Sequence, residues 1–242
     1  MASAQTRCAP ARAGSLSAQV ADELGRRIVA RRYAPTATLP PEAALLQEFG
    51  VSRSVLRDAI KSVASKGLLE VRQRRGTTVT PRHRWNMLDA EVLGWIAQSG
   101  ADPQLLISLT ELRLIVEPGA CVLAVARGDE QALQRVEAAW ARMVEHADDR
   151  ARFVEADRDF HVALLRAAGN EYLGAVSTAI AAALPVSLRV SNATTRGNRA
   201  SLISHECIVT ALRSGDGQAA AAASRRQLED AMRHLRAGAG KS

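Results

Sequence analysis

Aromatic residues, cysteines and long hydrophobic segments are all scarce in this sequence. Phenylalanine, tryptophan and tyrosine together account for 3% of the 242 residues, while alanine, leucine and arginine dominate. With β-branched residues also sparse, this composition predicts a mostly helical protein. No apolar run reaches the roughly 18–20 residues that span a bilayer, and residues 1–14 lack the apolar core of a signal peptide. We therefore expect no membrane partner.

The three cysteines, Cys8, Cys121 and Cys207, show no spacing typical of a disulfide framework. Unpaired thiols are typical of a reducing compartment, so we expect a cytoplasmic protein. Apolar residues make up 47% of the chain, which excludes a disordered protein and supports a proper core. A length of 242 residues predicts one large domain or two modest ones.

Positive charge is concentrated in the first third of the chain. The net charge is +7, with 32 Lys and Arg against 25 Asp and Glu. Residues 1–84 hold 15 of the basic and 6 of the acidic residues, whereas the remainder holds 17 and 19. This asymmetry indicates a polyanionic partner for the first third, although a merely soluble basic domain fits the charge alone equally well.

Residues 15–80 carry the pattern of a winged helix-turn-helix domain. Apolar residues at helical spacing, with punctuating glycines, predict helices near 17–32, 41–49 and 52–66. Two short extended pieces, 68–72 and 77–80, flank a Gln-Arg-Arg-Gly segment and predict a hairpin. Residues 1–14 are expected to form a disordered arm, and residues 81–87 a linker.

From residue 88 to residue 238 the helical period continues almost without interruption. Helices separated by Gly, Asp, Asn and Pro residues are expected near 88–99, 103–127, 130–146, 149–168, 171–190, 198–213 and 217–237. Pro118 is expected to kink or split the second of these helices. With no strand pattern and no repeat, residues 88–238 are predicted to form an all-helical domain; the residues discussed below give it the predicted roles of effector binding and dimerisation.

The third predicted helix places two arginines on one exposed face. Arg53 and Arg57 are four residues apart, and the first turns of such a helix meet base edges in the major groove. An arginine can bind guanine bidentately, and Ser52 and Ser54 can donate to phosphates. The hairpin adds candidates for phosphate or minor-groove contact, namely Arg72, Arg74, Arg75 and Gly76. Solvated arginines on a surface helix are the alternative.

These segments resemble the DNA-binding domain of the GntR family of bacterial transcription regulators. The motif is long and specific, and it matches Leu39-Pro40-Pro41-Glu42 and the segments 49–59, 67–72 and 75–77. The resemblance implies that Ser52, Arg53, Ser54 and Arg57, with the tip of the wing, contact the operator. Ala43 is a departure, because many members carry an arginine there, and one operator contact is therefore missing or moved.

Asp157 and His161 are four residues apart on a predicted helix, where a carboxylate and an imidazole can share one divalent ion. His205, on a later helix, is also expected to face inward. Three such groups from two helices can form a site for zinc, nickel or manganese. A structural contact between the first two is the alternative.

The same region resembles the FCD ligand-binding domain that follows the winged helix in the FadR branch of the family. Matching segments are 111–118, 157–161, 167–170 and 205–216. In metal-binding members an Asp and three His bind the ion, which implies that Asp157, His161 and His205 are three of the ligands. The register places Gln227 where the fourth, a histidine, is expected, and His234 lies about 10 Å further along the helix. The resemblance thus implies a divalent metal that is held more weakly than in four-ligand members.

Arg113 lies on the helix whose family counterpart faces this pocket, so the resemblance implies that it binds the effector. A buried guanidinium can clamp a carboxylate bidentately, although an ion pair with Glu111 or Glu117 is the alternative. Ser201, one turn before His205, can add a hydroxyl contact to a polyol. The residues alone indicate a small carboxylate. The segment 85–95 also resembles the linker of a sugar-acid-responsive family member, which implies an effector such as D-galactonate.

Together these patterns predict a homodimeric repressor that binds a short palindrome of double-stranded DNA and leaves it when a small acid binds the bundle. We expect no enzymatic activity, because no separate general base and no nucleophile motif accompany the candidate metal ligands. A metal-dependent enzyme acting on a small acid, with a basic nucleic-acid-binding head, is the alternative. A nonspecific DNA-packaging protein is disfavoured by the slightly acidic helical region.

Overall fold

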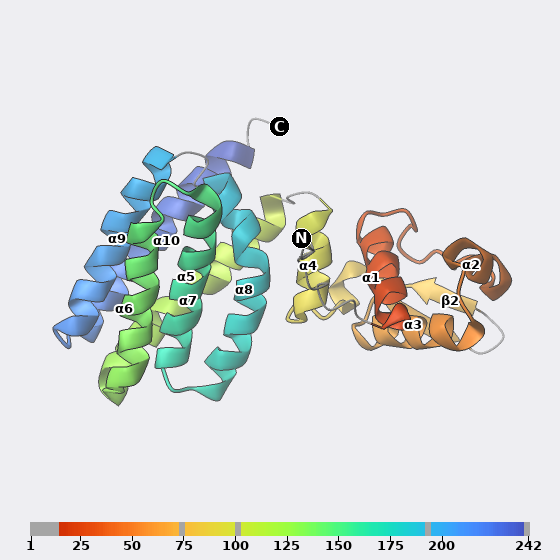
Figure 1. The fold of residues 1–242 in the computed structure, drawn as a ribbon, viewed down its shortest axis with the longest axis horizontal. Helices are drawn as coiled ribbons and strands as arrows, with labels where there is room; N and C mark the ends of the chain where they lie inside the picture. The colour runs from red at the N-terminus through yellow and green to blue at the C-terminus, as the bar shows by residue number, and fades with distance from the viewer. Residues whose placement is uncertain (1–14, 73–75, 100–102, 192–194, 240–242) are drawn as a thin grey trace, which may run out of the picture. The chain divides into compact units, whose positions relative to one another are not determined.

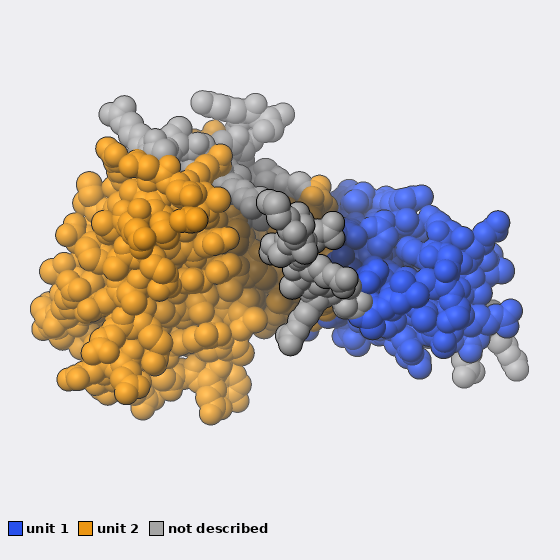
Figure 2. Space-filling view, in the orientation of Figure 1, with its two compact units in different colours: residues 1–86 blue, residues 87–242 orange. Residues whose placement is uncertain are grey.

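The computed structural model describes residues 15–72, 76–99, 103–191 and 195–239. The chain divides into two compact units, residues 1–86 and residues 87–242 (Figures 1 and 2). In the described residues, three α-helices, a hairpin and a short 3-10 helix form the first unit, and helices alone form the second. The predicted fold class, a winged helix-turn-helix followed by an all-helical bundle, is confirmed.

The first unit is built on three helices and a two-stranded hairpin. Its elements are α1 (Leu16–Val29), α2 (Glu42–Phe49), α3 (Arg53–Ser65), β1 (Leu69–Arg72), β2 (Gly76–Val79) and a short 3-10 helix η1 (Arg82–Arg84). Gly50 ends α2 in the left-handed conformation, which an L side chain rarely adopts. Ser52 then caps α3 through its hydroxyl, which accepts a hydrogen bond from the Val55 N–H. The core forms where Leu24 and Ile28 of α1 and Leu56 of α3 are fully buried.

A third extended segment pairs with the wing, which the sequence pattern did not reveal. β1 and β2 pair antiparallel from Leu69 opposite Val79 to Arg72 opposite Gly76. The segment before α2, read from sequence as a loop, also pairs with β2, because the Leu39 N–H donates to the Thr77 carbonyl at 2.8 Å. These contacts hold the segment that leads into α2 against the wing.

Residues 81–86, assigned from sequence to a linker, lie within the first unit. The Trp85 indole N–H donates to the Thr80 carbonyl at 3.2 Å, and the Asn86 N–H donates to the Lys66 carbonyl at 2.9 Å. Gly67 allows this approach, since a Cβ there would lie 2.2 Å from the Arg84 carbonyl oxygen. The chain is thus fastened to the end of α3 before it enters the second unit.

The second unit is a bundle of long helices. They are α4 (Ala90–Gln98), α5 (Pro103–Arg127), α6 (Glu130–Glu145), α7 (Arg150–Ala167), α8 (Glu171–Ser191), α9 (Thr195–Arg213) and α10 (Gly217–Ala239). α5 runs through Pro118 as one helix, so the split that was one of the two expected effects of this proline does not occur. No helix in the described ranges is long and apolar enough to cross a membrane.

Helix α7 lies at the centre of this bundle and is buried on two sides. Phe153 and Phe160 face one apolar cluster, which α5, α6, α9 and α10 complete. Val154 and Leu165 face a second cluster, which includes side chains of α4, α5 and α8. Polar residues of α7 that point inward must therefore find partners on other helices or stay unsatisfied.

Candidate functional site

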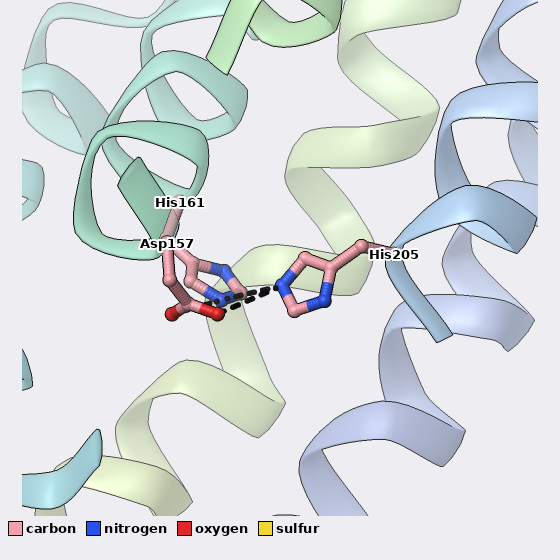
Figure 3. Close-up of side chains that lie close together, drawn as sticks. All are labelled: Asp157, His161 and His205. Carbon is pink, nitrogen blue, oxygen red and sulfur yellow. Dashed lines mark hydrogen bonds and ion pairs between the residues drawn. The ribbon is translucent and has the colours of Figure 1, made fainter. Parts of the chain in front are cut away.

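Two histidines and an aspartate converge in the middle of the bundle. Asp157 and His161 project from α7 and His205 from α9, and all three are fully buried. Their potential ligand atoms lie within 4.8 Å of one another (Figure 3). The two Nε2 atoms are 3.3 Å apart, and the Asp157 carboxylate oxygens lie 3.5 Å from His161 Nε2 and 3.4 Å from His205 Nε2. The structure thus brings together all three residues that the sequence singled out.

Hydrogen bonds on the far side of each ring define its tautomer. His161 Nδ1 lies 2.8 Å from a Glu117 carboxylate oxygen, and His205 Nδ1 lies 2.7 Å from the Ser201 carbonyl. Both partners can only accept, so each Nδ1 carries the proton and each Nε2 presents a lone pair. The two lone pairs point at the same small volume beside Asp157.

The donor set around this volume fits a divalent cation. Neither oxygen of Asp157 accepts a hydrogen bond from any described residue, although the side chain is completely buried. Gln227 of α10 also reaches the site, with its amide nitrogen 3.1 Å from His205 Nε2 and its oxygen left without a donor. A half-turn of this amide would bring the oxygen inward. A carboxylate, two imidazole lone pairs and an amide oxygen form a hard-to-borderline set that suits zinc, nickel or manganese.

Burial keeps the two imidazoles neutral, the protonation state that metal binding requires. It lowers the pKa of His161 and lowers that of His205 to about 4, so both imidazoles are neutral near pH 7. Burial also raises the pKa of Asp157, an effect that His161 and Arg113 partly offset. A bound cation would reverse that penalty, because it favours the charged carboxylate.

Arg113 of α5 is buried beside these ligands. Its Nε donates to a Glu117 oxygen at 2.6 Å, and its Nη2 lies 2.9 Å from His161 Nε2. Burial raises the pKa of Glu117, but Arg113 and His161 more than offset this and hold it at about 2. The pairing of Arg113 with Glu117, an alternative in the sequence, is therefore present, whereas Glu111 faces Arg236 at 3.9 Å.

Glu117 itself was not among the predicted site residues. The available signal was its spacing of four residues from Arg113, which places both on one face of a helix.

Ser201, expected from the sequence to contact a polyol effector, contacts the far side of a site histidine. Its hydroxyl lies 3.3 Å from His205 Nδ1, on the side of the ring away from the Nε2 cluster. His234 is exposed and bonds to the Asp230 carbonyl, well outside the cluster.

In the first unit, the candidate DNA-contacting residues line the start of α3. The side chains of Arg53 and Arg57 are 78% and 63% exposed. The carboxylate of Glu42, at the start of α2, lies 3.8 Å from Arg53 Nε and 3.4 Å from Arg57 Nη2. Ser52 and Ser54 are exposed, with their hydroxyls 3.0 Å apart. Glu42, which the sequence placed only within the family motif, therefore faces both arginines.

The wing contributes fewer described residues to this surface. Arg72, the last residue of β1, is exposed and its Nε donates to Glu70 at 3.1 Å. Gly76 begins β2 with a φ of +83°, a conformation that favours glycine. Arg74 and Arg75 lie outside the described residues.

Comparison with known proteins assigns both units. Residues 16–79 match the model of bacterial regulatory proteins of the gntR family, and residues 108–230 match the FCD domain. The chain belongs to the GntR family of transcription regulators. In this GntR regulator the first unit is the DNA-binding domain, and the FCD domain implies a small-molecule effector for the second.

Individual relatives agree with this family assignment over most of the chain. The galactonate operon transcriptional repressor of Escherichia coli is 35% identical over 217 residues, which cover 88% of this chain and 93% of the relative. The uncharacterised regulator YieP of the same organism is 31% identical and covers 85% and 89%. A solved structure of Lar from Listeria monocytogenes, 19% identical, superposes with a TM-score of 0.70 over 94% of this chain and 99% of that one, which shows a shared fold.

Proposed function

We propose that this GntR regulator is a repressor that leaves its operator when a small hydroxy acid binds the FCD domain together with a divalent metal. The observation that carries the proposal is the buried cluster of Asp157, His161 and His205, with the Arg113 guanidinium in contact with it. A carboxylic acid is the ligand that suits both features, since a guanidinium binds it bidentately and a hard cation binds its oxygens.

A sugar acid such as D-galactonate is the proposed effector. The similarity to the galactonate operon repressor supports this choice. When bound, a divalent ion would supply open positions for a carboxylate oxygen and the hydroxyl on the adjacent carbon. Arg113 would bind the carboxylate from the α5 side, and Ser201 is proposed to contact a more distant hydroxyl. Gln227 would complete the ligand set, and because a neutral amide binds such ions less strongly than an imidazole, the ion should be easily stripped.

The proposed operator contacts lie at the start of α3 and in the wing. Arg53 and Arg57 would read base edges, and Ser52 and Ser54 would bind phosphates. The proposed wing contacts are Arg72, Arg74, Arg75 and Gly76. Because a palindromic operator requires a two-fold protein, we propose a homodimer, acting in the cytoplasm where the DNA is. Its relatives are regulators, and we propose no enzymatic activity.

Calorimetry and DNA binding with the full-length protein test the effector proposal. D-galactonate should bind metal-loaded protein and release DNA taken from upstream of the protein's own gene, whereas chelated protein should respond weakly. His161→Ala and Arg113→Ala should bind that DNA normally but no longer release it. Equal binding of sugar acids without metal and to Arg113→Ala would contradict the proposal.

A further inference from the structure

Glu117 is a completely buried carboxylate that contacts both the proposed acid-binding arginine and one of the proposed metal ligands. One oxygen accepts from Arg113 Nε at 2.6 Å, and the other accepts from His161 Nδ1 at 2.8 Å. Its side chain is 0% exposed. A buried charge is costly unless it is paired, and here both partners belong to the proposed site.

We propose that Glu117 is a positioning residue that makes metal binding and acid binding depend on each other. The proposal rests on the function proposed above, in which His161 is a metal ligand and Arg113 holds the acid. Glu117 would act on the metal through the tautomer of His161 and on the acid through the orientation of the Arg113 guanidinium.

The two contacts need a carboxylate rather than another polar group. Both partners donate to Glu117, so it must accept in two directions at once. An amide of the same shape has only one accepting end. If its oxygen stayed on charged Arg113, its NH₂ would face His161 Nδ1, which would have to become the acceptor. The ring proton would then move to Nε2 and cover the lone pair that a metal ligand must offer, and Arg113 Nη2 could no longer donate to it.

The position of Arg113 explains why the two binding events would be linked. Its Nη2 lies 2.9 Å from His161 Nε2, so the guanidinium occupies the lone pair that a metal ligand must offer. Anchored at Nε by Glu117, the outer part of the guanidinium can turn away while the anchor holds. An acid's carboxylate would draw Nη2 off the imidazole and offset the repulsion between the arginine and a nearby cation. Acid should therefore strengthen metal binding, and by reciprocity metal should strengthen acid binding.

The test uses full-length Glu117→Gln, titrated with Zn²⁺ in the presence and absence of D-galactonate. We expect wild type to bind Zn²⁺ more tightly when the acid is present. The variant should bind Zn²⁺ about 10–100-fold more weakly, as is typical when the hydrogen-bond partner of a ligating histidine is lost, and the acid should no longer help. Glu111→Gln is the matched control, because this acid lies on the same helix, is 53% exposed and should behave as wild type.

A second measurement has a wild-type part that does not depend on the variant folding. In metal-free wild type, ¹⁵N NMR of the histidines should show His161 protonated on Nδ1 only, and in Glu117→Gln the proton should move to Nε2. An Nε2 proton on His161 in metal-free wild type would overturn the proposal.

The outcomes separate this inference from the proposed function. If wild type binds Zn²⁺ and D-galactonate independently, or Glu117→Gln keeps the wild-type affinities, the positioning role is wrong and the effector site stands. If wild type binds neither, both fail.

Discussion

At the scale of single residues, burial determines what the ionisable groups of the FCD domain can do. Asp157 is a carboxylate at 0% exposure with no donor among the described residues, an arrangement that lowers stability. Arg113 and Glu117, also buried, satisfy each other at 2.6 Å. A bound cation would compensate the buried, unsatisfied carboxylate of Asp157 and so explain why it lies in the core.

Replacement of Asp157 by asparagine should therefore stabilise the metal-free protein. The amide removes the buried carboxylate, and its NH₂ can donate to one of the two imidazole lone pairs, which lie 3.4–3.5 Å from the carboxylate oxygens. We expect the free energy of unfolding of chelated protein to rise by about 1–3 kcal/mol in urea titrations, while metal binding is lost. Asp159→Asn, a partly exposed acid on the same helix, is the control and should change stability little. A less stable Asp157→Asn protein in chelator would contradict this account of the site.

Gly67→Ala should destabilise the DNA-binding domain through a backbone clash. Gly67 has a φ of +83°, and a Cβ there would lie 2.2 Å from the Arg84 carbonyl oxygen. Gly50→Ala is the matched control, because Gly50 also has a positive φ, +63°, but nothing within 4 Å of the added Cβ. We expect Gly50→Ala to cost about 1 kcal/mol of unfolding free energy and Gly67→Ala clearly more. Equal costs, measured by thermal or urea unfolding, would show that residues 81–86 move away without penalty.

At the scale of elements, one face of α3 packs into the core, and the opposite face exposes Arg53 and Arg57. Leu56, Ala59 and Val63 are fully buried, while Arg53 and Arg57 are largely exposed. Glu42 of α2 lies beside both guanidinium groups. Exposed pairs of this kind contribute little to stability, so we expect the loss of either arginine to change DNA binding rather than folding.

Arg53→Ala should weaken operator binding by about 1–3 kcal/mol and relax base preference at one position. The physical reason is the loss of a bidentate contact to a base edge. Fluorescence anisotropy at fixed salt, with operator and mutated-operator DNA, measures both effects. Arg213→Ala, which removes an exposed arginine paired with Glu137 in the FCD domain, is the control. Unchanged affinity and specificity in Arg53→Ala would show that α3 docks differently from the proposal.

At the scale of the whole molecule, the protein combines a basic reading unit with a helical sensing unit. The two units are compact and each has its own buried core. In the proposed mechanism, acid binding inside the FCD domain must change how the two DNA-binding domains of a homodimer meet the operator. The unit that holds the copies together is therefore central to the proposed mechanism.

We expect the FCD domain to hold the dimer together. Residues 87–242 expose large apolar side chains, among them Ile115 at 76% and Tyr172 at 85%, and form the larger unit. Sedimentation of this fragment at micromolar concentration should show a dimer, whereas residues 1–86 should sediment as a monomer. A monomeric FCD fragment would contradict the prediction and place the contact in the DNA-binding domain.

Local sequence patterns were enough to predict the fold class and the inward-facing residues. Helix and strand positions follow from apolar periodicity, caps and glycines, all of which act over a few residues. The same reasoning predicted that Asp157 and His161 lie on one face of a helix and that His205 faces inward. Family motifs then identified the DNA-binding and FCD domains from short contiguous segments.

Only the tertiary structure decided how distant residues pair. The contact between Glu117 and His161 joins residues 44 apart in the chain, and that between Arg113 and His161 joins residues 48 apart. The pairing of the segment before α2 with β2, and the hydrogen bonds that hold residues 81–86 against the first unit, are likewise contacts between separate segments. Periodicity shows which way a side chain faces, but not which partner meets it there. Partner choice depends on helix packing, and at this site it places the predicted effector-binding arginine in a network with Glu117 and His161.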